Sequence, residues 1–515
     1  MKLKQILLPI ITLATILACS TSSKANSNEI ESKTDSYEIK IKINGLKDSV
    51  AYLANYVGRN IFYYDTAIVK NGEFTFRKEK YPHGVYAIIA SLKPKPIYFD
   101  ILINEKNISL ETDLDNIIPK MNVKVSEENK LFYNYINYLR IQSMKKNPLM
   151  SQRESLDKNL DKEKIKSIET KVKNIDSLVM KFQLDFVKKN QDKYVGKLMN
   201  MSVEIEIPDA PKEITDKEEI NIWKYEYYKN HYLDKIDFKD ERLGRSALFH
   251  NQISNYFMKV IPQIPDTINK RLTQYMNNLQ PGGDMMKYSV EYLTYAHVKT
   301  KLMGMDAVYV HMADNYILNG KSEWIGKDKI EKIRPKVDKM RPTLLGKTAP
   351  NIILADTTEK NWKNLHEVKS DYTLLIFWSD DCGHCKREIP KYKKFYDSIK
   401  KATDVSFEIF AVCTHLENTG WRKFIKQHNL NWINVSDFPD LRDNYSKYIK
   451  RTTYVNGEKI TTGFTDGKSI NFRNSYDVFV TPVGYLLDKN KKIIAKQFEF
   501  EQLDGILKHN IEISK

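Results

Sequence analysis

The sequence predicts a multidomain α+β protein with an N-terminal antiparallel, β-sandwich-like domain, a central helical domain and a C-terminal α/β domain. Three features predict this order. Hydrophobic residues alternate with polar ones in the first part, recur every three or four residues in the middle part, and form an apolar run followed by a helical pattern in the last part. The 515 residues suffice for about three domains that each bury a core.

The composition is that of a folded protein, with 41% hydrophobic and 29% charged residues. The formal net charge of +16 comes from lysines scattered through sequence of mixed sign, without a long basic block. We therefore expect no nucleic-acid partner, and we interpret the charge as a solvated surface that favours anionic membranes or acidic partners.

The first 35 residues predict export. Two lysines near the start precede an apolar run from Ile6 to Leu17, which is too short to cross a bilayer. Residues 1–18 are expected to be a signal peptide and residues 19–35 a polar tether. The sequence Ile-Leu-Ala-Cys that ends at Cys19 resembles a bacterial lipobox. This resemblance implies that Cys19 is lipidated and anchors the protein to a membrane of the bacterial cell envelope, facing the periplasm; a plain secretory peptide is the alternative.

Residues 36–125 are expected to form the β domain. Polar and apolar residues alternate from Tyr37 to Ile43, and Asn71-Gly72 is a hairpin signal before a further alternating run. No catalytic constellation is present in this region, so we expect a packing or docking role.

Residues 126–345 are expected to form the helical domain. Apolar residues at steps of three and four define one helix seam, namely Ile165, Ile168, Val172, Ile175, Val179, Phe182 and Phe186. This seam fits packing within its own domain or an intermolecular coiled coil. An aromatic cluster is expected in the core or at an interface, namely Trp223, Tyr225, Tyr227, Tyr228 and Tyr232. No metal site is expected, because four histidines lack metal-ligand spacing, namely His231, His250, His297 and His311.

Residues 346–515 are expected to form the α/β domain. Strands are expected from Thr373 to Ser379, from Phe407 to Thr414, from Gly484 to Leu487 and from Ile493 to Lys496. Helices are expected from Cys385 to Lys401, from Gly420 to Gln427 and from Glu501 to Lys508. The order is a βαβ unit followed by a hairpin and a last helix.

The most informative motif is Cys382-Gly383-His384-Cys385, which closely follows the first of these strands. The chain has only four cysteines, so a pair at this spacing is not expected to belong to a structural disulfide framework. Two thiols one helical turn apart can cycle between dithiol and disulfide, and Cys382 at a helix start is the expected nucleophile. Gly383 and His384 are the expected redox-tuning residues, and the carboxylate of Asp381 opposes the ionisation of Cys382.

These motifs resemble the thioredoxin-like, AhpC/TSA-type domain of membrane-anchored thiol-disulfide interchange proteins of the TlpA and ResA type. The resemblance implies that Cys382 attacks, that Cys385 resolves the mixed disulfide, and that Glu388 takes the proton of Cys385. The alternative for Glu388 is a surface pair with a lysine. The resemblance also implies protein thiol or disulfide substrates in the envelope, a protein that supplies or accepts electrons, and no cofactor.

The same resemblance assigns substrate binding to Thr481-Pro482, as a cis-proline loop that faces the reactive cysteine. Trp378, four residues before Cys382, is expected to pack beside the site, to shield it and to contact the substrate. Pro390 is expected to kink the helix that carries the cysteines. The β and helical domains resemble two uncharacterised domains that precede thioredoxin-like domains in exported lipoproteins.

Two further features of the last domain lead to expectations. Cys413 ends a strand and is expected to be a buried, inert thiol, with a third redox role or a metal-ligand role as the alternative. Residues 445–472 exceed the family pattern and carry the turn signals Asn456-Gly457 and Asp466-Gly467, so we expect a β excursion near the cis-proline loop that limits access to Cys382.

A thiol-disulfide oxidoreductase is the leading hypothesis, and reduction is favoured slightly over oxidation or isomerisation. A peroxiredoxin-like peroxidase would need a proline where Leu375 stands, although Ser379 offers a hydroxyl. Covalent haem attachment would need a histidine where Lys386 stands. A non-enzymatic scaffold lipoprotein that binds an envelope partner is the alternative from a different class.

Overall fold

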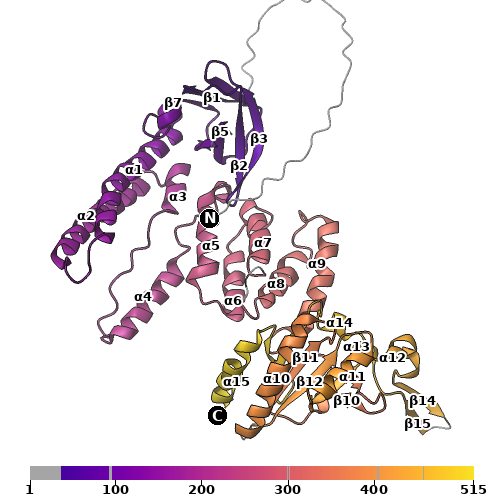
Figure 1. Cartoon of the computed structure of the whole chain (residues 1–515). Helices are drawn as coiled ribbons and strands as arrows, with labels where there is room; N and C mark the ends of the chain where they lie inside the picture. The colour runs from indigo at the N-terminus through magenta and orange to yellow at the C-terminus, as the bar shows by residue number, and fades with distance from the viewer. Residues whose placement is uncertain are drawn as a thin grey trace, which may run out of the picture.

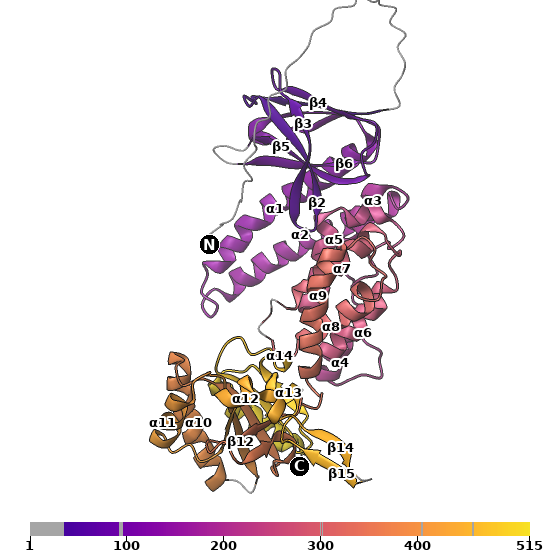
Figure 2. The ribbon, with the colours of Figure 1, turned by 90° about the vertical axis from the view of Figure 1, so that its right-hand side faces the viewer.

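The computed structural model describes residues 36–91, 96–298, 300, 302–402, 405–455 and 458–514. Figure 1 shows a β part in indigo, a helical part in magenta and pink, and an α/β part in orange and yellow. Figure 2 shows the β and α/β parts at opposite ends of the molecule. The predicted fold class is therefore confirmed. The predicted signal peptide, the tether and Cys19 lie outside the described residues.

The strands of the β part are β1 (Tyr37–Asn44), β2 (Val50–Val57), β3 (Asn60–Ile68), β4 (Glu73–Lys78), β5 (Gly84–Ser91), β6 (Ile97–Ile103), β7 (Asn107–Asp113) and β8 (Asn122–Val125). Within the described ranges they form two sheets, with the orders β4-β1-β7-β8 and β3-β2-β5-β6. Every second side chain of β1 is buried, as its alternation predicts. One pairing corrects the antiparallel expectation, because β1 runs parallel to β7; the second sheet, which lies between them in sequence, supplies the long crossover that a parallel pair needs.

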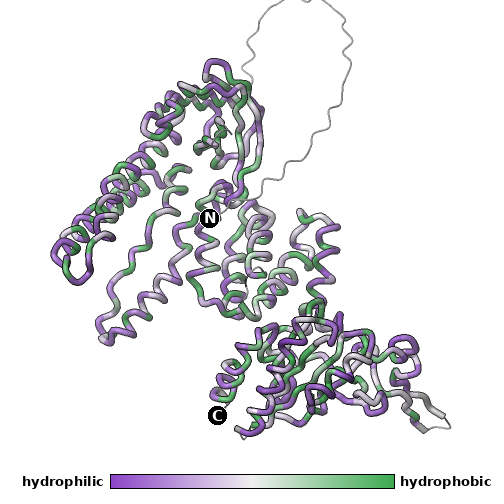
Figure 3. The backbone as a smooth tube through the Cα atoms, in the orientation of Figure 1, coloured by the Kyte–Doolittle hydropathy of each residue, from purple (hydrophilic) through white to green (hydrophobic). Residues whose placement is uncertain are grey.

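A helical hairpin of α1 (Glu127–Glu154) and α2 (Lys162–Lys189) extends from the β part (Figure 1). Tyr138 of α1 stacks on Phe182 of α2 with ring centroids 3.8 Å apart, and Tyr135 packs on Phe186 at 4.8 Å. Figure 3 shows hydrophilic and hydrophobic residues mixed along both helices, as expected for helices that each bury one face. The seam of α2 therefore packs on α1 of the same chain, which is the intramolecular alternative.

The other helices of the middle part are α3 (Tyr194–Asn200), α4 (Lys217–His231), α5 (Ala247–Asn255), α6 (Pro265–Met276), α7 (Asp284–Ala296), α8 (Asp306–Met312) and α9 (Lys327–Met340). They share a hydrophobic core with the β part, and the expected aromatic cluster contributes Tyr232, which stacks on Tyr256 at 5.7 Å. Burial lowers the pKa of His250 and of His297. Among the described residues, no cluster of potential metal ligands is present and no helix is long and apolar enough to cross a membrane.

The α/β part contains β9 (Ile353–Ala355), β10 (Trp362–Asn364), β11 (Tyr372–Trp378), β12 (Phe407–Cys413), β13 (Ile433–Ser436), β16 (Val483–Leu487) and β17 (Ile493–Lys496). Its helices are α10 (Gly383–Ala402), α11 (Asn418–Gln427), α12 (Pro439–Asp443), α13 (Gly467–Ile470), α14 (Phe472–Ser475) and α15 (Phe500–Ser514). The sheet order is β10-β9-β13-β12-β11-β16-β17, with β11 parallel to β12 and antiparallel to β16.

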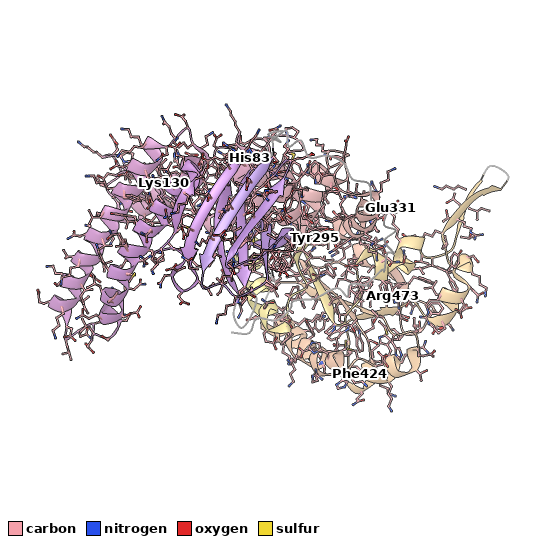
Figure 4. The ribbon with its side chains drawn as sticks, turned by 90° about the horizontal axis from the view of Figure 1, so that it is seen from above. His83, Lys130, Tyr295, Glu331, Phe424 and Arg473 are labelled. Atoms are coloured by element: carbon pink, nitrogen blue, oxygen red, sulfur yellow. The ribbon has the colours of Figure 1, made fainter. Side chains whose placement is uncertain are left out.

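Each face of this sheet has its own hydrophobic core. One core packs residues of α10, α11 and α15 on the sheet, and the other packs residues of α12 and α14. Figure 4 labels Phe424 of α11 and Arg473 of α14 within this part. The expected strands are found within one residue of their bounds, and Pro390 lies inside α10 as expected, whereas the last helix continues to Ser514.

The predicted β excursion exists, as the antiparallel pair β14 (Arg451–Val455) and β15 (Glu458–Thr462). Its base packs on the edge strand β10, where Phe464 stacks on Trp362 with ring centroids 5.2 Å apart. Four strands, β9, β13, β12 and β11, separate this edge from β16, which follows the Thr481-Pro482 bond. The expected position near the cis-proline loop is therefore corrected, because the stacking on Trp362 holds the hairpin at the opposite edge (Figure 1).

Candidate active site

The two cysteines of the motif lie where β11 passes into α10. Helix α10 begins at Gly383, so Cys382 stands directly before the helix and Cys385 lies in its first turn. Both are free thiols; Cys382 is half-buried, whereas Cys385 is completely buried. All residues of β11 are buried, so the strand holds the start of α10 in place. As a result, the sulfur of Cys382 lies near the surface and that of Cys385 lies in the core.

The surroundings of Cys382 lower the pKa of its thiol. Burial by itself raises the pKa of Cys382, but hydrogen bonds from the backbone N–H groups of Cys385 and His384 contribute to a net lowering. These N–H groups belong to the first turn of α10, where backbone donors have no partner within the helix. A side-chain hydrogen bond with Thr481 also lowers this pKa, whereas the protonated thiol donates to the carbonyl oxygen of Thr481 at 3.4 Å. Cys382 is therefore the thiol whose charged form the site stabilises.

The second thiol is held protonated. Burial raises the pKa of Cys385 to about 12, although its sulfur accepts a hydrogen bond of 3.5 Å from the backbone N–H of Ser379, which acts in the opposite direction. The site thus lowers the pKa of one thiol and raises that of the other, although the two are only three residues apart in the chain.

This difference predicts selective alkylation of the reduced protein. Iodoacetamide is expected to label Cys382 with a pH midpoint below the ordinary thiol value of about 8.5, and to leave Cys385 and Cys413 unmodified at neutral pH. The rate rises with pH because only the thiolate reacts. Peptide mass spectrometry after timed labelling measures it, with labelling of all three residues in denaturant as the control. A midpoint at or above about 8.5 for Cys382 would contradict the expectation.

The Thr481-Pro482 peptide bond is cis, as expected, and its loop faces Cys382 through the Thr481 carbonyl. The two residues before it, Phe479 and Val480, are 77% and 79% exposed. Lys339 of α9 lies over the ring of Phe479, 5.1 Å from its centroid, so the helical part reaches this loop. Substrate binding by Thr481 and Pro482 remains a prediction.

The two expected redox-tuning residues lie at the exposed start of α10. The imidazole Nδ1 of His384 is 3.3 Å from a guanidinium nitrogen of Arg387, and the contact through which His384 lowers the pKa of Cys382 comes from its backbone N–H and not from its ring. A Cβ added to Gly383 would meet only Arg387, at 3.9 Å. Glycine is therefore not required at this position by packing.

Glu388 is half-buried one turn after Cys385. Its carboxylate accepts a hydrogen bond of 2.9 Å from Lys391, and no bond between Glu388 and Cys385 is present in the described part of the chain. The structure thus shows the lysine pair that was the alternative for Glu388. Its role as the base for Cys385 remains a prediction.

The expected contact between Trp378 and a substrate is corrected. Trp378 has 0% of its surface exposed and packs on Phe424, with ring centroids 5.3 Å apart, in the core beneath α10. As the last residue of β11, it alternates with Phe377, which enters the core on the other face of the sheet. Trp378 therefore supports the site from below and offers no surface to a bound chain.

Cys413 is completely buried in the same core as Trp378 and Cys385. Burial raises the pKa of Cys413 far above the ordinary thiol range, and its strand neighbour is Trp378. This environment is that of an inert thiol, as the leading expectation for Cys413 stated.

Sequence reasoning did not foresee that His415 contacts the two aspartates before Cys382. Its Nδ1 lies 2.8 Å from Oδ1 of Asp380, and its Nε2 lies 3.6 Å from Oδ2 of Asp381. A signal was available, because Asp380 and His415 follow the ends of two apolar runs. The ends of neighbouring parallel strands meet at one edge of a sheet, but that these two strands are neighbours is a tertiary fact.

Three family models match the chain. Residues 345–496 match the AhpC/TSA family, residues 157–341 match a domain of unknown function, DUF5106, and residues 37–132 match another, DUF4369.

Similar proteins match the C-terminal part. The thiol-disulfide oxidoreductase ResA of a Bacillus cereus strain is 26% identical over 166 residues, which is 32% of this chain and 76% of that protein. A solved domain of a possible thiol-disulfide isomerase from Cytophaga hutchinsonii ATCC 33406 is 33% identical, covers 33% of this chain and 94% of that one, and has a TM-score of 0.25. A thioredoxin-like protein from Bacteroides caccae ATCC 43185 is 17% identical and has a TM-score of 0.31. The match covers 59% of this chain and 98% of that one.

The AhpC/TSA match coincides with the part of the chain that holds the two cysteines. Through residues 345–496 the chain therefore belongs to the AhpC/TSA family, as a thioredoxin-like oxidoreductase domain that follows a DUF4369 domain and a DUF5106 domain.

Proposed function

We propose that this protein is an exported thiol-disulfide oxidoreductase that exchanges electrons with envelope proteins through Cys382 and Cys385. The observation that carries the proposal is the contrast between the two thiols: Cys382 is accessible with a lowered pKa, and Cys385 is buried with a raised one. The relatives named thiol-disulfide oxidoreductase support the same reaction class.

In the proposed reaction, the Cys382 thiolate attacks one sulfur of a substrate disulfide. A mixed disulfide forms, and the other substrate sulfur leaves as a thiolate. Cys385 then loses its proton and attacks the sulfur of Cys382, which releases the second substrate thiolate and leaves a disulfide between Cys382 and Cys385. The substrate gains two electrons and, with its thiolates protonated, two protons. The protein becomes oxidised, and a dithiol partner protein reduces it again.

We propose that electrons flow toward the substrate, so that the protein acts as a reductase. The expected midpoint potential lies nearer that of reducing thioredoxin, about −270 mV, than that of protein disulfide isomerase, about −180 mV. The proposed location is the cell envelope facing the periplasm, with Cys19 lipidated.

Equilibration with glutathione buffers tests the proposal. The purified protein is expected to show one two-electron transition that consumes the thiols of Cys382 and Cys385 and leaves Cys413 free. Thiol counting by mass spectrometry measures it, with Cys413→Ser as the control that keeps the transition. A protein that never forms this disulfide under oxidising conditions would refute the proposed function.

The substitution Glu388→Gln tests the base for the second step. If Glu388 takes the proton of Cys385, its loss is expected to lengthen the lifetime of the mixed disulfide roughly 100-fold or more, because general base assistance is removed. Rapid acid quench and separation of the mixed disulfide measure this lifetime. Lys391→Gln is the matched control, since it breaks the same ion pair but keeps the carboxylate. An unchanged lifetime would show that Glu388 is not the base for Cys385 and serves only as the ion-pair partner of Lys391.

A further inference from the structure

One imidazole joins two carboxylates directly before the reactive thiol. His415 lies 2.8 Å from Asp380 through Nδ1 and 3.6 Å from Asp381 through Nε2. Asp381 is the residue immediately before Cys382, and the hydroxyl of Ser379 donates a hydrogen bond to its carboxylate. This bond, and to a lesser degree the charge of His415, hold the pKa of Asp381 below its usual range. A charged carboxylate therefore stands next to the proposed nucleophile.

The pairing of β11 with β12 brings these residues together. Trp378 and Cys413 are partners in the parallel ladder, and the backbone N–H of Thr414 donates to the carbonyl of Trp378 at 2.8 Å. Asp380 and His415 each follow one of these two strand ends by two residues. Asp380 is 7% exposed, and a Cβ added to Gly420 of α11 would lie 2.1 Å from its Oδ2. The buried carboxylate is thus enclosed between α11 and the imidazole.

The backbone on either side of His415 is held by two arginines. Arg473, labelled in Figure 4, donates at 2.9 Å to the carbonyl of Thr414, and Arg442 donates to the carbonyl of Leu416. Both guanidinium groups also bond Asp437, which is 1% exposed. These bonds hold the backbone on both sides of His415 in place.

The cluster joins three carboxylates to one imidazole and two guanidinium groups. The carboxylates are those of Asp380, Asp381 and Asp437, and the side chains that contact them are His415, Arg442 and Arg473. Lys386 of α10 is a further cation that acts on Asp381. Each arginine is paired with Asp437, so His415 is the base that bridges the two carboxylates of the segment before Cys382.

We propose that His415 is a positioning residue that offsets the charge of Asp380 and Asp381 and thereby sets how readily Cys382 ionises. A carboxylate beside a thiol disfavours its thiolate, and a cation bonded to that carboxylate reduces the effect. The inference rests on the proposed function, since it concerns the nucleophile of that reaction.

The test is a double-mutant comparison of His415→Gln and Asp381→Asn, with the pKa of Cys382 measured from the pH dependence of its alkylation. His415→Gln is expected to raise this pKa by about 0.5 to 1, and Asp381→Asn to lower it. In the double variant the effect of His415→Gln is expected to shrink to less than about half, because a charge that it offset is gone. The rate of disulfide reduction at neutral pH is expected to fall only about two- to threefold in His415→Gln, because a less acidic thiol is a better nucleophile once ionised.

His231→Gln is the matched control, because His231 also pairs with an aspartate, Asp234, at 2.6 Å but belongs to the helical part. It is expected to leave the pKa of Cys382 unchanged. Circular dichroism of each variant checks that it folds. The proposal is overturned if folded His415→Gln leaves the pKa of Cys382 unchanged. It is also overturned if His415→Gln shifts this pKa equally in the wild-type and in the Asp381→Asn background. The alkylation readout needs no turnover, so a wild-type protein that reduces no disulfide would refute the proposed function and leave this test intact.

Discussion

Replacement of Cys382 by serine is expected to abolish disulfide reduction, with a loss of about a thousandfold or more. A serine hydroxyl does not ionise near neutral pH, and the buried thiol of Cys385 cannot take over, because burial raises its pKa to about 12 and leaves it no exposed surface. Insulin reduction with dithiothreitol as the electron source measures the loss. Cys413→Ser is the control and is expected to keep its activity, since that thiol lies in the core. Substantial activity in Cys382→Ser would contradict the assignment of the nucleophile.

Cys385→Ala is the informative partner of this variant. It keeps the attacking thiolate but lacks the thiol that resolves the mixed disulfide, so covalent complexes with substrates are expected to accumulate. Non-reducing electrophoresis of cell-envelope extracts detects them. The double variant Cys382→Ser, Cys385→Ala is expected to form none, which separates true intermediates from unspecific disulfides.

The substitution Trp378→Ala is expected to destabilise the C-terminal domain by about 3 to 5 kcal/mol, because it removes a large, fully buried side chain from a closely packed core. The lost contacts include the ring of Phe424, at 5.3 Å between centroids. Denaturant unfolding followed by a probe in this domain measures the change, since a chain of several domains need not unfold in one step. Phe479→Ala is the matched control, because Phe479 is 77% exposed and its loss is expected to change stability by less than about 0.5 kcal/mol.

This pair of variants also tests the corrected role of Trp378. A Trp378→Ala protein of normal stability that bound substrates weakly would restore the tryptophan to the binding surface. The expected result is the reverse, a clear loss of stability that precedes any loss of substrate binding.

Much of the fold follows from local patterns in the sequence. The alternation from Tyr37 to Ile43 fixes which side of β1 is buried, because successive side chains of a strand point to opposite faces. The apolar run that ends at Trp378 and the helical pattern after it place Cys382 at a helix start and Cys385 one turn inside it. These features need only neighbours in sequence, and the cysteine pair was therefore predictable with its opposite environments.

The strand neighbours and the pairing of side chains were decided only by the tertiary structure. Whether Trp378 is exposed depends on α11, which covers that face of the sheet. The contact of His415 with Asp380 exists because β11 and β12 are adjacent, 35 residues apart in the chain. The sequence by itself determined the two thiols and the helix that presents them, since both are encoded within a few residues. His415, which contacts the two carboxylates before Cys382, comes from a segment far away in the sequence, and only the pairing of β11 with β12 brings it within interaction distance.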